Sequence, residues 1–335
     1  MSLPDPITVA IVGCGKQAEK HITGYAAADN VNCVLVDADQ SAATALSEAN
    51  GWPIAETIES ALSQGIDAID ICTPTPSHRP LIELAIEHGK HIFCEKPACE
   101  SAEDCRHLAD AASGAGLVAM IGFVYRFVPS LIDCHRLLRA GCIGEPIAAT
   151  LRAGGRGSHR LWKHRADSGG GAISEMMVHM IDLACWFFGA PASSELLASS
   201  LLRPERMIEG RLEQCDAEDW AMARLTTQGG AEVLVQADLV TPAFTQFVEL
   251  QGTNGTLRGS IQSDQPCFAF CLEPHGDMPS GRTVLDSEPV NLYHAQMGHF
   301  IDHVRRGDLN VRASLADSVP VLDTMEQIAS QAMAC

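Results

Sequence analysis

Basic residues are scarce in this sequence, which narrows the range of partners. The chain has 23 lysines and arginines against 42 aspartates and glutamates, giving a formal net charge of −19 at pH 7. Nucleic acids and anionic membranes attract basic surfaces. We therefore expect neither a nucleic acid nor a membrane as a partner.

Paired cysteine motifs are absent, although the chain has 13 cysteines. The closest are Cys267 and Cys271, followed by Cys94 and Cys99, and none forms a C-x-x-C pair. Scattered cysteines of this kind are typical of reduced, buried thiols. The sequence predicts neither a disulfide framework nor a metal site.

Long apolar runs are also lacking. No uninterrupted apolar run reaches the ~18 residues that a membrane-spanning helix needs. The first expected strand begins at Ile7, which leaves no room for a signal peptide. We expect a cytoplasmic protein.

The length and composition indicate a globular chain with two domains. The chain has 335 residues, of which 46% are apolar and 19% charged. These are ordinary values, and the length suffices for two separate cores. The pattern described below predicts a first domain at 1–123 and a second at 124–335.

A glycine-rich turn follows the first expected strand. ITVAIV (7–12) is typical of a strand buried in a parallel sheet, and Gly13-Cys14-Gly15-Lys16-Gln17-Ala18 then opens a helix. In such a G-x-G-x-x-A turn the glycines allow a tight bend and close approach of a pyrophosphate, which the helix N-terminus attracts. The turn predicts a dinucleotide site.

An acidic residue at the end of the second expected strand indicates which dinucleotide is bound. Asp37 follows VNCVLV and is placed to bond the adenosine ribose hydroxyls. No Arg or Lys follows to accept a 2′-phosphate, and Asp39 adds a second acid, although it is interpreted as a turn residue. We expect NAD in preference to NADP.

Strands and helices then alternate, which predicts a doubly wound parallel sheet. AIDICTP (68–74), HIFCEKP (91–97) and LVAMIGF (117–123) are the further strands, and helices are expected at 76–88 and from Ser101 to near Gly114. Ligands of such sheets bind at the carboxyl ends of the strands. The residues expected there are Thr73, Pro74, Thr75, His78, Glu95 and Lys96.

The Glu95-Lys96-Pro97 triplet is the candidate for proton transfer. A lysine in a cleft beside a nicotinamide is desolvated, which favours proton transfer near neutral pH. The alternative is an ordinary solvated lysine in a turn. Its place at the end of a strand favours the functional interpretation.

Taken in order, these motifs resemble the Gfo/Idh/MocA family of NAD(P)-dependent oxidoreductases, which includes glucose–fructose oxidoreductase and inositol dehydrogenase. The matching stretches are VAIVGCGKQAEKH, ICTPTPSH, CEKP, GFVYRF, the run GGG-x3-E-x3-H-x2-D from Gly169, and VELQGTNGTLRG. The resemblance implies a Rossmann domain followed by an α+β domain with a large, mostly antiparallel, open-faced sheet. It also implies Lys96 as a catalytic acid/base.

The family's second motif places an Asp and a His four residues apart on a helix. Here these positions are Glu175 and His179, followed by Asp182, so the chain departs from the family by one methylene at 175. The departure puts an inherited substrate in doubt more than it does hydride transfer.

These three residues lie in an expected helix, 172–188, that is otherwise almost entirely apolar. Their i, i+4, i+7 spacing puts them on one face of an α-helix. A helix so apolar is expected to be buried, and buried charges must be paired, hydrogen-bonded or used. They either form a structural network around His179 or present Glu175 and His179 to substrate, and we favour the second interpretation.

A cationic segment precedes the three glycines. RAGGRGSHRLWKHR (152–165) holds five of the Lys and Arg residues and no acid. Arg156, Trp162 and Arg165 could recognise a carboxylate or phosphate on a sugar-like substrate. A solvated or intersubunit loop explains the segment equally well.

The remaining sequence predicts a domain built on a mostly antiparallel sheet. A linker and a helix span 124–140, where Arg126 either contacts cofactor or substrate or serves the domain junction. Strands are expected at IAATLRA, ELLASSLL, WAMARLTT, AEVLVQAD, QFVELQG, TLRGSI and CFAFCLE, with a hairpin turn at Asn254-Gly255. Helices are expected at 293–306 and 314–333, the latter limited by Pro320. One face of the sheet should pack on helices and the other should pair subunits in a homodimer or homotetramer.

The predicted function is NAD-dependent hydride transfer to or from a hydroxyl or keto carbon of a sugar, polyol or sugar acid. Lys96 and His179 would handle the proton, with Glu175 assisting, and the substrate could be anionic. One alternative is a redox-neutral enzyme of epimerase, lyase or glycosidase type that uses NAD transiently. The other is a non-catalytic NAD-binding regulator, which would not need Lys96 and His179.

Overall fold

The computed structural model describes residues 5–156, 160–262, 264–286 and 288–332. It divides into two compact units: Met1–Phe127 with Val290–Leu322, and Val128–Pro289 with Asp323–Cys335. The predicted domain boundary at 123/124 lies four residues before the point, after Phe127, where the chain first passes from one unit to the other. The segment 290–322 does not follow it, because helix α8 (Leu292–Arg306) packs against α1 (Lys16–Ala26) of the first unit.

The first unit contains a parallel sheet of five strands in the order β2-β1-β3-β4-β5. The strands are β1 (Ile7–Val12), β2 (Val31–Val36), β3 (Ala68–Ile71), β4 (His91–Cys94) and β5 (Ala119–Ile121). A parallel bridge from Leu35 to Ile54 adds a one-residue sixth strand beside β2. With it, the order is that of a classical Rossmann sheet, whose crevice lies between β1 and β3.

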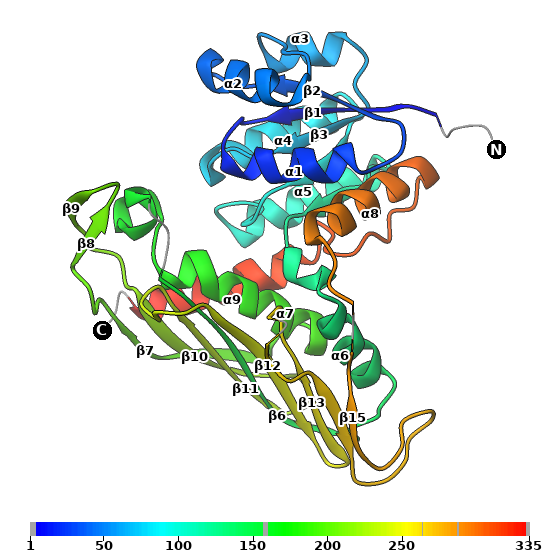
Figure 1. Ribbon diagram of the computed structural model, residues 1–335, viewed down its shortest axis with the longest axis vertical. Helices are drawn as coiled ribbons and strands as arrows, with labels where there is room; N and C mark the ends of the chain where they lie inside the picture. Colours follow the sequence, from blue (N-terminus) through cyan, green and yellow to red (C-terminus); the bar gives the residue numbers. More distant parts are fainter. Residues whose placement is uncertain (1–4, 157–159, 263, 287, 333–335) are drawn as a thin grey trace. The chain divides into compact units, whose positions relative to one another are not determined.

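Helices cover this sheet, and their starts follow the sequence signals. They are α1, α2 (Gln40–Asn50), α3 (Ile58–Ser63), the 3-10 turn η1 (Thr75–Ser77), α4 (His78–Glu87), α5 (Ala102–Gly114), the 3-10 turn η2 (Val124–Phe127) and α8. Ser101 caps α5 by accepting a hydrogen bond from the amide of Asp104, as expected. Figure 1 shows α1 and α8 side by side, which explains the return of the chain to this unit.

The second unit contains an eight-stranded sheet in the order β15-β14-β13-β12-β6-β11-β10-β7. The strands are β6 (Pro146–Gly154), β7 (Ser193–Ser200), β10 (Trp220–Thr226), β11 (Glu232–Asp238), β12 (Thr245–Gly252), β13 (Gly255–Gly259), β14 (Phe268–Cys271) and β15 (Gly281–Val284). Within this sheet, only the β6–β11 pair is parallel among the described strand pairs. The mostly antiparallel prediction is therefore confirmed.

Helices α6 (Pro129–Arg139) and α7 (Val178–Phe188) lie on one face of this sheet (Figure 1). The last helix, α9 (Ser318–Ala332), starts late because Pro320 lacks an amide hydrogen and suits only the first turn. The hairpin turn between β12 and β13 is Thr253-Asn254, one residue earlier than expected. A separate hairpin, β8 (Glu205–Ile208) and β9 (Arg211–Gln214), and strand β15 were not predicted.

The apolar stretch Ala166–Phe188 is long and apolar enough, by length and composition alone, to cross a membrane. In this structure 67% of its most apolar window is buried inside the protein, as expected of a core helix. The twelve cysteines of the described residues form no disulfide with one another, and ten of them are buried.

Candidate active site

The glycine turn after β1 is shaped for a closely approaching ligand. Gly13 has φ +94°, and a methyl group there would lie 2.9 Å from the carbonyl carbon of Cys72, so only glycine fits. At Gly15 a methyl group would meet no atom of the described residues within 4 Å. The first glycine therefore closes the turn, and the second keeps the space in front of it open.

The N-terminus of α1 faces this open space without a side-chain cap, because its N-cap residue is Gly15. Uncapped amides at a helix N-terminus bind anions. Beside it, the hydroxyl of Thr73 is buried and makes no hydrogen bond within the described structure. These features fit the pyrophosphate and adjacent polar groups of a dinucleotide.

Asp37 lies at the end of β2, where the ribose-binding acid was predicted. One carboxylate oxygen accepts a hydrogen bond from the amide of Cys14 (2.6 Å) and the other from the amide of Asp39 (2.8 Å). The carboxylate is therefore fixed against the glycine turn. Asp39 caps α2 through Ser41, which agrees with its interpretation as a turn residue.

The loops after β3 and β4 are tied together by His78. Its buried ring lies between two carbonyl oxygens, 2.8 Å from that of Thr73 and 2.9 Å from that of Pro97. Pro74 and Thr75 lead into η1 beside it. His78 thus supports the predicted cofactor loops through their backbone.

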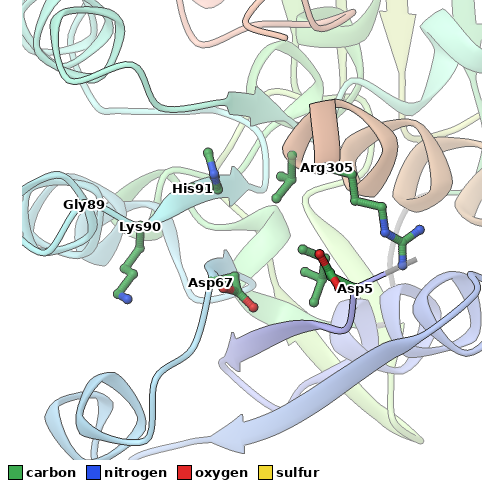
Figure 2. Close-up of a pocket in the computed structure, with 8 residues that line it drawn as sticks. Asp5, Asp67, Gly89, Lys90, His91 and Arg305 are labelled. Carbon is green, nitrogen blue, oxygen red and sulfur yellow. The ribbon is translucent and has the colours of Figure 1, made fainter. Parts of the chain in front are cut away.

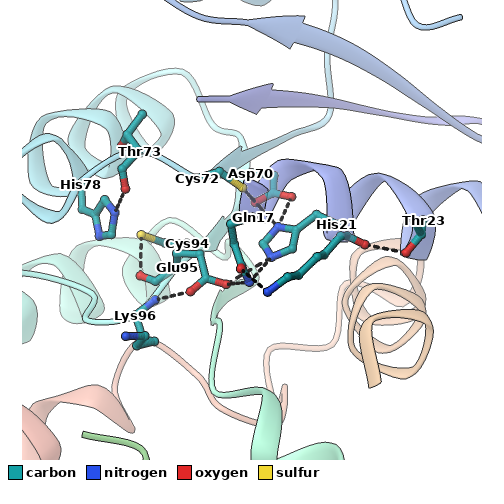
Figure 3. Close-up of polar contacts among 11 residues, drawn as sticks. Gln17, His21, Thr23, Asp70, Cys72, Thr73, His78, Cys94, Glu95 and Lys96 are labelled. Atoms are coloured by element: carbon teal, nitrogen blue, oxygen red, sulfur yellow. Dashed lines mark hydrogen bonds and ion pairs between the residues drawn. The ribbon is translucent and has the colours of Figure 1, made fainter. Parts of the chain in front are cut away.

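Lys96 is half-buried at the end of β4, and the Lys96–Pro97 peptide is cis. Its amide donates a hydrogen bond to the carboxylate of Glu95 (3.1 Å). The side-chain amide of Gln17, which was predicted to bind cofactor, donates a hydrogen bond to Glu95 (2.8 Å). Figure 3 shows these residues together with His21, which sequence reasoning missed.

A cavity of about 450 Å³ lies elsewhere in the first unit. It is lined by Asp5, Ile7, Asp67, Gly89, Lys90, His91, Val304 and Arg305 (Figure 2). Six of these residues lie at the amino ends of β1, β3 and β4, and Val304 and Arg305 lie in the last turn of α8. Dinucleotides bind at carboxyl ends, so this cavity is not the cofactor site.

In the second unit, the expected helix begins differently from the prediction. Ile173–Met177 is a π-helical turn, η5, and the amide of Val178 bonds the carbonyl of Ile173. Glu175 therefore lies in the wider turn, whereas His179 and Asp182, which are three residues apart, both lie in α7. The prediction of a continuous α-helix over 172–188 is therefore wrong in its first turn, which is π-helical.

The glycines before this helix leave space for the backbone of Lys163 and the carboxylate of Glu218. A methyl group at Gly170 would lie 2.5 Å from the carbonyl carbon of Lys163, and one at Gly171 would strike the carboxylate of Glu218. Glu218 accepts a hydrogen bond from the amide of Ile173 (2.9 Å) and so caps the turn. Burial raises the pKa of Glu218, against the opposing hydrogen bond from Ile173.

The three polar residues of this helix differ in exposure. Asp182 is buried, and His179 and Glu175 are half-buried. Glu175 forms an ion pair with Lys163, whose ammonium also lies 5.0 Å from the centre of the Trp162 ring. Lys163 is a second residue that sequence reasoning missed, although it belongs to the cationic segment.

The other cations of that segment contact groups of the same unit. Arg160 pairs with Glu209 (3.2 Å), and Arg165 with Asp216 (3.4 Å). Arg156 donates to the carbonyl of Pro242 (2.6 Å), and Trp162 is exposed. The acids come from β10's preceding loop and the β8–β9 hairpin, which the sequence did not place beside this segment. Residues 157–159 lie outside the described residues.

Arg126 is buried in the first unit, where it pairs with Asp317 (3.2 Å), and its carbonyl accepts a hydrogen bond from Arg312. These contacts join η2 to the segment that precedes and begins α9. All three residues belong to the first unit, and the role of Arg126 toward cofactor, substrate or domain junction stays a prediction.

Two family models match this chain, one in each of its two main parts. A model described as "Oxidoreductase family, NAD-binding Rossmann fold" of Gfo/Idh/MocA matches residues 7–123, and the model of the family's C-terminal domain matches 132–258. The inositol 2-dehydrogenase 1 of Saccharopolyspora erythraea is 34% identical over 313 residues, covering 90% of this chain and 87% of that protein. The chain belongs to the Gfo/Idh/MocA family.

Other members of the Gfo/Idh/MocA family show lower coverage or lower identity. The D-glucoside 3-dehydrogenase of Escherichia coli is 30% identical over 204 residues, which span 58% of each chain and so less than two thirds of that relative. A solved levoglucosan dehydrogenase in complex with NADH and levoglucosan has a TM-score of 0.86 at 21% identity and covers 98% of both chains. That likeness shows the fold, which is a Rossmann domain with an open-faced sheet domain.

Proposed function

We propose that this member of the Gfo/Idh/MocA family is an NAD-dependent dehydrogenase of a sugar, polyol or sugar acid. The observation that carries the proposal is the open, uncapped N-terminus of α1 behind Gly13 and Gly15, in the same unit as the Lys96 loop. Related proteins are dehydrogenases of inositol and D-glucosides by name. Asp37 beside the turn supports NAD over NADP, because its negative charge would repel the 2′-phosphate of NADP.

The proposed roles divide between cofactor and substrate. Gly13, Gly15, Lys16, Asp37, Thr73 and the loops held by His78 would bind NAD, which supplies hydride transfer when bound. Lys96 and His179 would handle the substrate's hydroxyl proton, one as base and the other as hydrogen-bond donor to the developing oxyanion. Glu175 and Asp182 would orient His179 or the substrate.

A substrate screen tests this function. Sugars, polyols and sugar acids are offered with NAD and, separately, with NADP, and absorbance at the reduced-nicotinamide band is followed. We expect net NADH formation with at least one compound and slower turnover with NADP. Tightly retained NAD without net NADH release would instead support a redox-neutral enzyme, and NAD binding without any turnover would support a regulator.

The anionic form of the substrate has its own test. Replacing Arg156, Arg160 and Arg165 together by Gln is expected to raise the KM of an anionic substrate by about tenfold, because Arg forks bind carboxylate and phosphate well. The melting temperature should change little, since exposed ion pairs contribute ~0–1 kcal/mol each. The KM of a neutral polyol serves as the control, and an unchanged KM for every anion would contradict an anionic substrate.

We propose that the open face of the eight-stranded sheet pairs subunits into a homodimer or homotetramer. Phe270 and Val284 are exposed on neighbouring strands β14 and β15, with Val284 opposite Phe268. Such residues would be covered in an assembly. The predicted cytoplasmic location likewise remains a proposal, and the free cysteines are compatible with it.

A further inference from the structure

A fully buried histidine lies between two carboxylates in the first unit. Nδ1 of His21 is 2.9 Å from Oδ2 of Asp70, and Nε2 is 3.1 Å from Oε1 of Glu95. His21 and Asp70 are inaccessible to solvent, and the side chain of Glu95 is 13% exposed. Figure 3 shows His21 at the centre of this chain of contacts.

Both ring nitrogens of His21 face a carboxylate oxygen, and a carboxylate can only accept. When both carboxylates are ionised, each nitrogen has to carry a proton to form its hydrogen bond, which makes the ring an imidazolium. Burial alone lowers the pKa of His21, but the charge of Asp70 and its hydrogen bond raise it well above its usual range. Burial likewise opposes ionisation of Glu95, yet the hydrogen bond and charge of His21 lower its pKa to about 2.

Glu95 joins three parts of the candidate cofactor site. Its Oε1 accepts from His21 and from Gln17 in the first turn of α1, and its Oε2 accepts from the amide of Lys96. A side chain at Gly122 would strike this carboxylate at 2.7 Å, so the backbone of residue 122 closes its remaining side. The position of Lys96 is thus fixed to the helix that begins the dinucleotide site.

We propose that His21 is a positioning residue: as an imidazolium between Asp70 and Glu95, it holds the Glu95–Lys96 segment to α1 so that Lys96 is aligned for proton transfer beside bound NAD. The proposal rests on the proposed function for the role of Lys96. It adds that the alignment depends on a charge buried beneath the second turn of α1. Sequence motifs alone place no such charge there.

A metal ion is the competing explanation for the cluster. Donor atoms of His21, Asp70 and Cys72 lie within 4.8 Å of one another. However, burial and the charge of Asp70 raise the pKa of the Cys72 thiol, which disfavours the thiolate that metals bind. The Cys72 thiol also lies 3.5 Å from Oδ1 of Asp70, to which it donates a hydrogen bond. Hydrogen bonds therefore account for this cluster without a metal ion.

The pH dependence follows from the groups that face His21. They are Asp70 on β3, Cys72 after it, Glu95 after β4, Gln17 on α1 and the ring of Tyr293 on α8. Tyr25 on α1 and Cys33 on β2 lie near Asp70. The folded pKa of His21 is raised, so its contribution to stability is complete below about pH 6.5. That contribution is lost as pH rises through the folded pKa.

The experiment uses the full chain with NAD and compares His21→Gln with the exposed control His107→Gln. We expect His21→Gln to lower kcat, per NAD-binding site, by about ten- to a hundredfold, because small misplacements of a catalytic group have effects of this size. The dissociation constant of NAD should change by less than about threefold. A purely structural role would reduce the number of NAD-binding sites and leave kcat per site unchanged, which would overturn the proposal.

Nitrogen-15 NMR of histidine-labelled wild-type protein with NAD supplies a readout independent of turnover. At pH 8 the His21 signals should show both ring nitrogens protonated, and Asp70→Asn should move the loss of that proton to lower pH. A neutral ring at pH 8, or loss of the ring protons on adding Zn²⁺, would overturn the proposal. If His21→Gln does not fold, Asp70→Asn replaces it in the kinetic comparison. If turnover instead proves independent of Lys96, the proposed function fails while the protonation result stands.

Discussion

Replacing Lys96 by Ala is expected to lower turnover at least about a hundredfold while the affinity for NAD stays within a few fold. General acid–base catalysis contributes about that much, and Lys96 is one of the two groups proposed to handle the substrate's hydroxyl proton. The backbone amide of Lys96, which bonds Glu95, is retained in the variant, so the loop should keep its structure. Turnover is measured under saturating NAD and substrate, and NAD affinity by fluorescence titration.

Lys90 offers a matched control for this experiment. It lies in the same unit but just before β4, at the amino end of the sheet. Lys90→Ala should therefore keep near-normal turnover. Near-normal turnover in Lys96→Ala as well would remove Lys96 from the mechanism, and equal losses in both variants would indicate a general effect of lost charge.

Two glycine substitutions in the turn after β1 should separate effects on folding from effects on cofactor binding. Gly13→Ala is expected to destabilise the first unit by about 2–4 kcal/mol, because the new methyl group meets the backbone of Cys72 and Thr73 at positive φ. Gly15→Ala meets no described atom and should keep the melting temperature, yet weaken NAD at least about tenfold by filling the space before the helix N-terminus.

Thermal unfolding and NAD titration of the two variants check this pair. Each glycine is the control for the other, since both changes add one methyl group to the same turn. Unchanged NAD affinity in Gly15→Ala would place the pyrophosphate elsewhere. An unchanged melting temperature in Gly13→Ala would show that the turn tolerates a side chain.

The Rossmann unit could be predicted closely from local signals. The buried strands, the glycine turn and the cap at Ser101 each depend on residues that are neighbours in the sequence, so each can be predicted from a short stretch. The placement of α8 was not predictable in this way, because its apolar face packs on α1, almost 270 residues earlier. The Asp70 carboxylate did carry a signal: a charge inside a strand buried on both faces requires a partner.

The second unit was harder to predict at its helix and hairpins. The apolar composition of 172–188 predicts burial but cannot distinguish a π turn from an α turn, which depends on tertiary contacts such as that of Glu218 with Ile173. Strands β8 and β9 escaped prediction because they are short, exposed and rich in charge. Whether Glu175, His179 and Lys96 act together stays a prediction from sequence and family.

The ion pair between Lys163 and Glu175 has a consequence for how this protein could select its substrate. The ammonium is already neutralised by a neighbour, so an incoming anion gains little from attraction alone. If the proposed anionic substrate binds at Lys163, it would have to exchange with the glutamate, which would then be released to bond another part of the same molecule. Selection by exchange would favour compounds that carry an acid group and a hydroxyl at a fixed separation over those that carry either one alone.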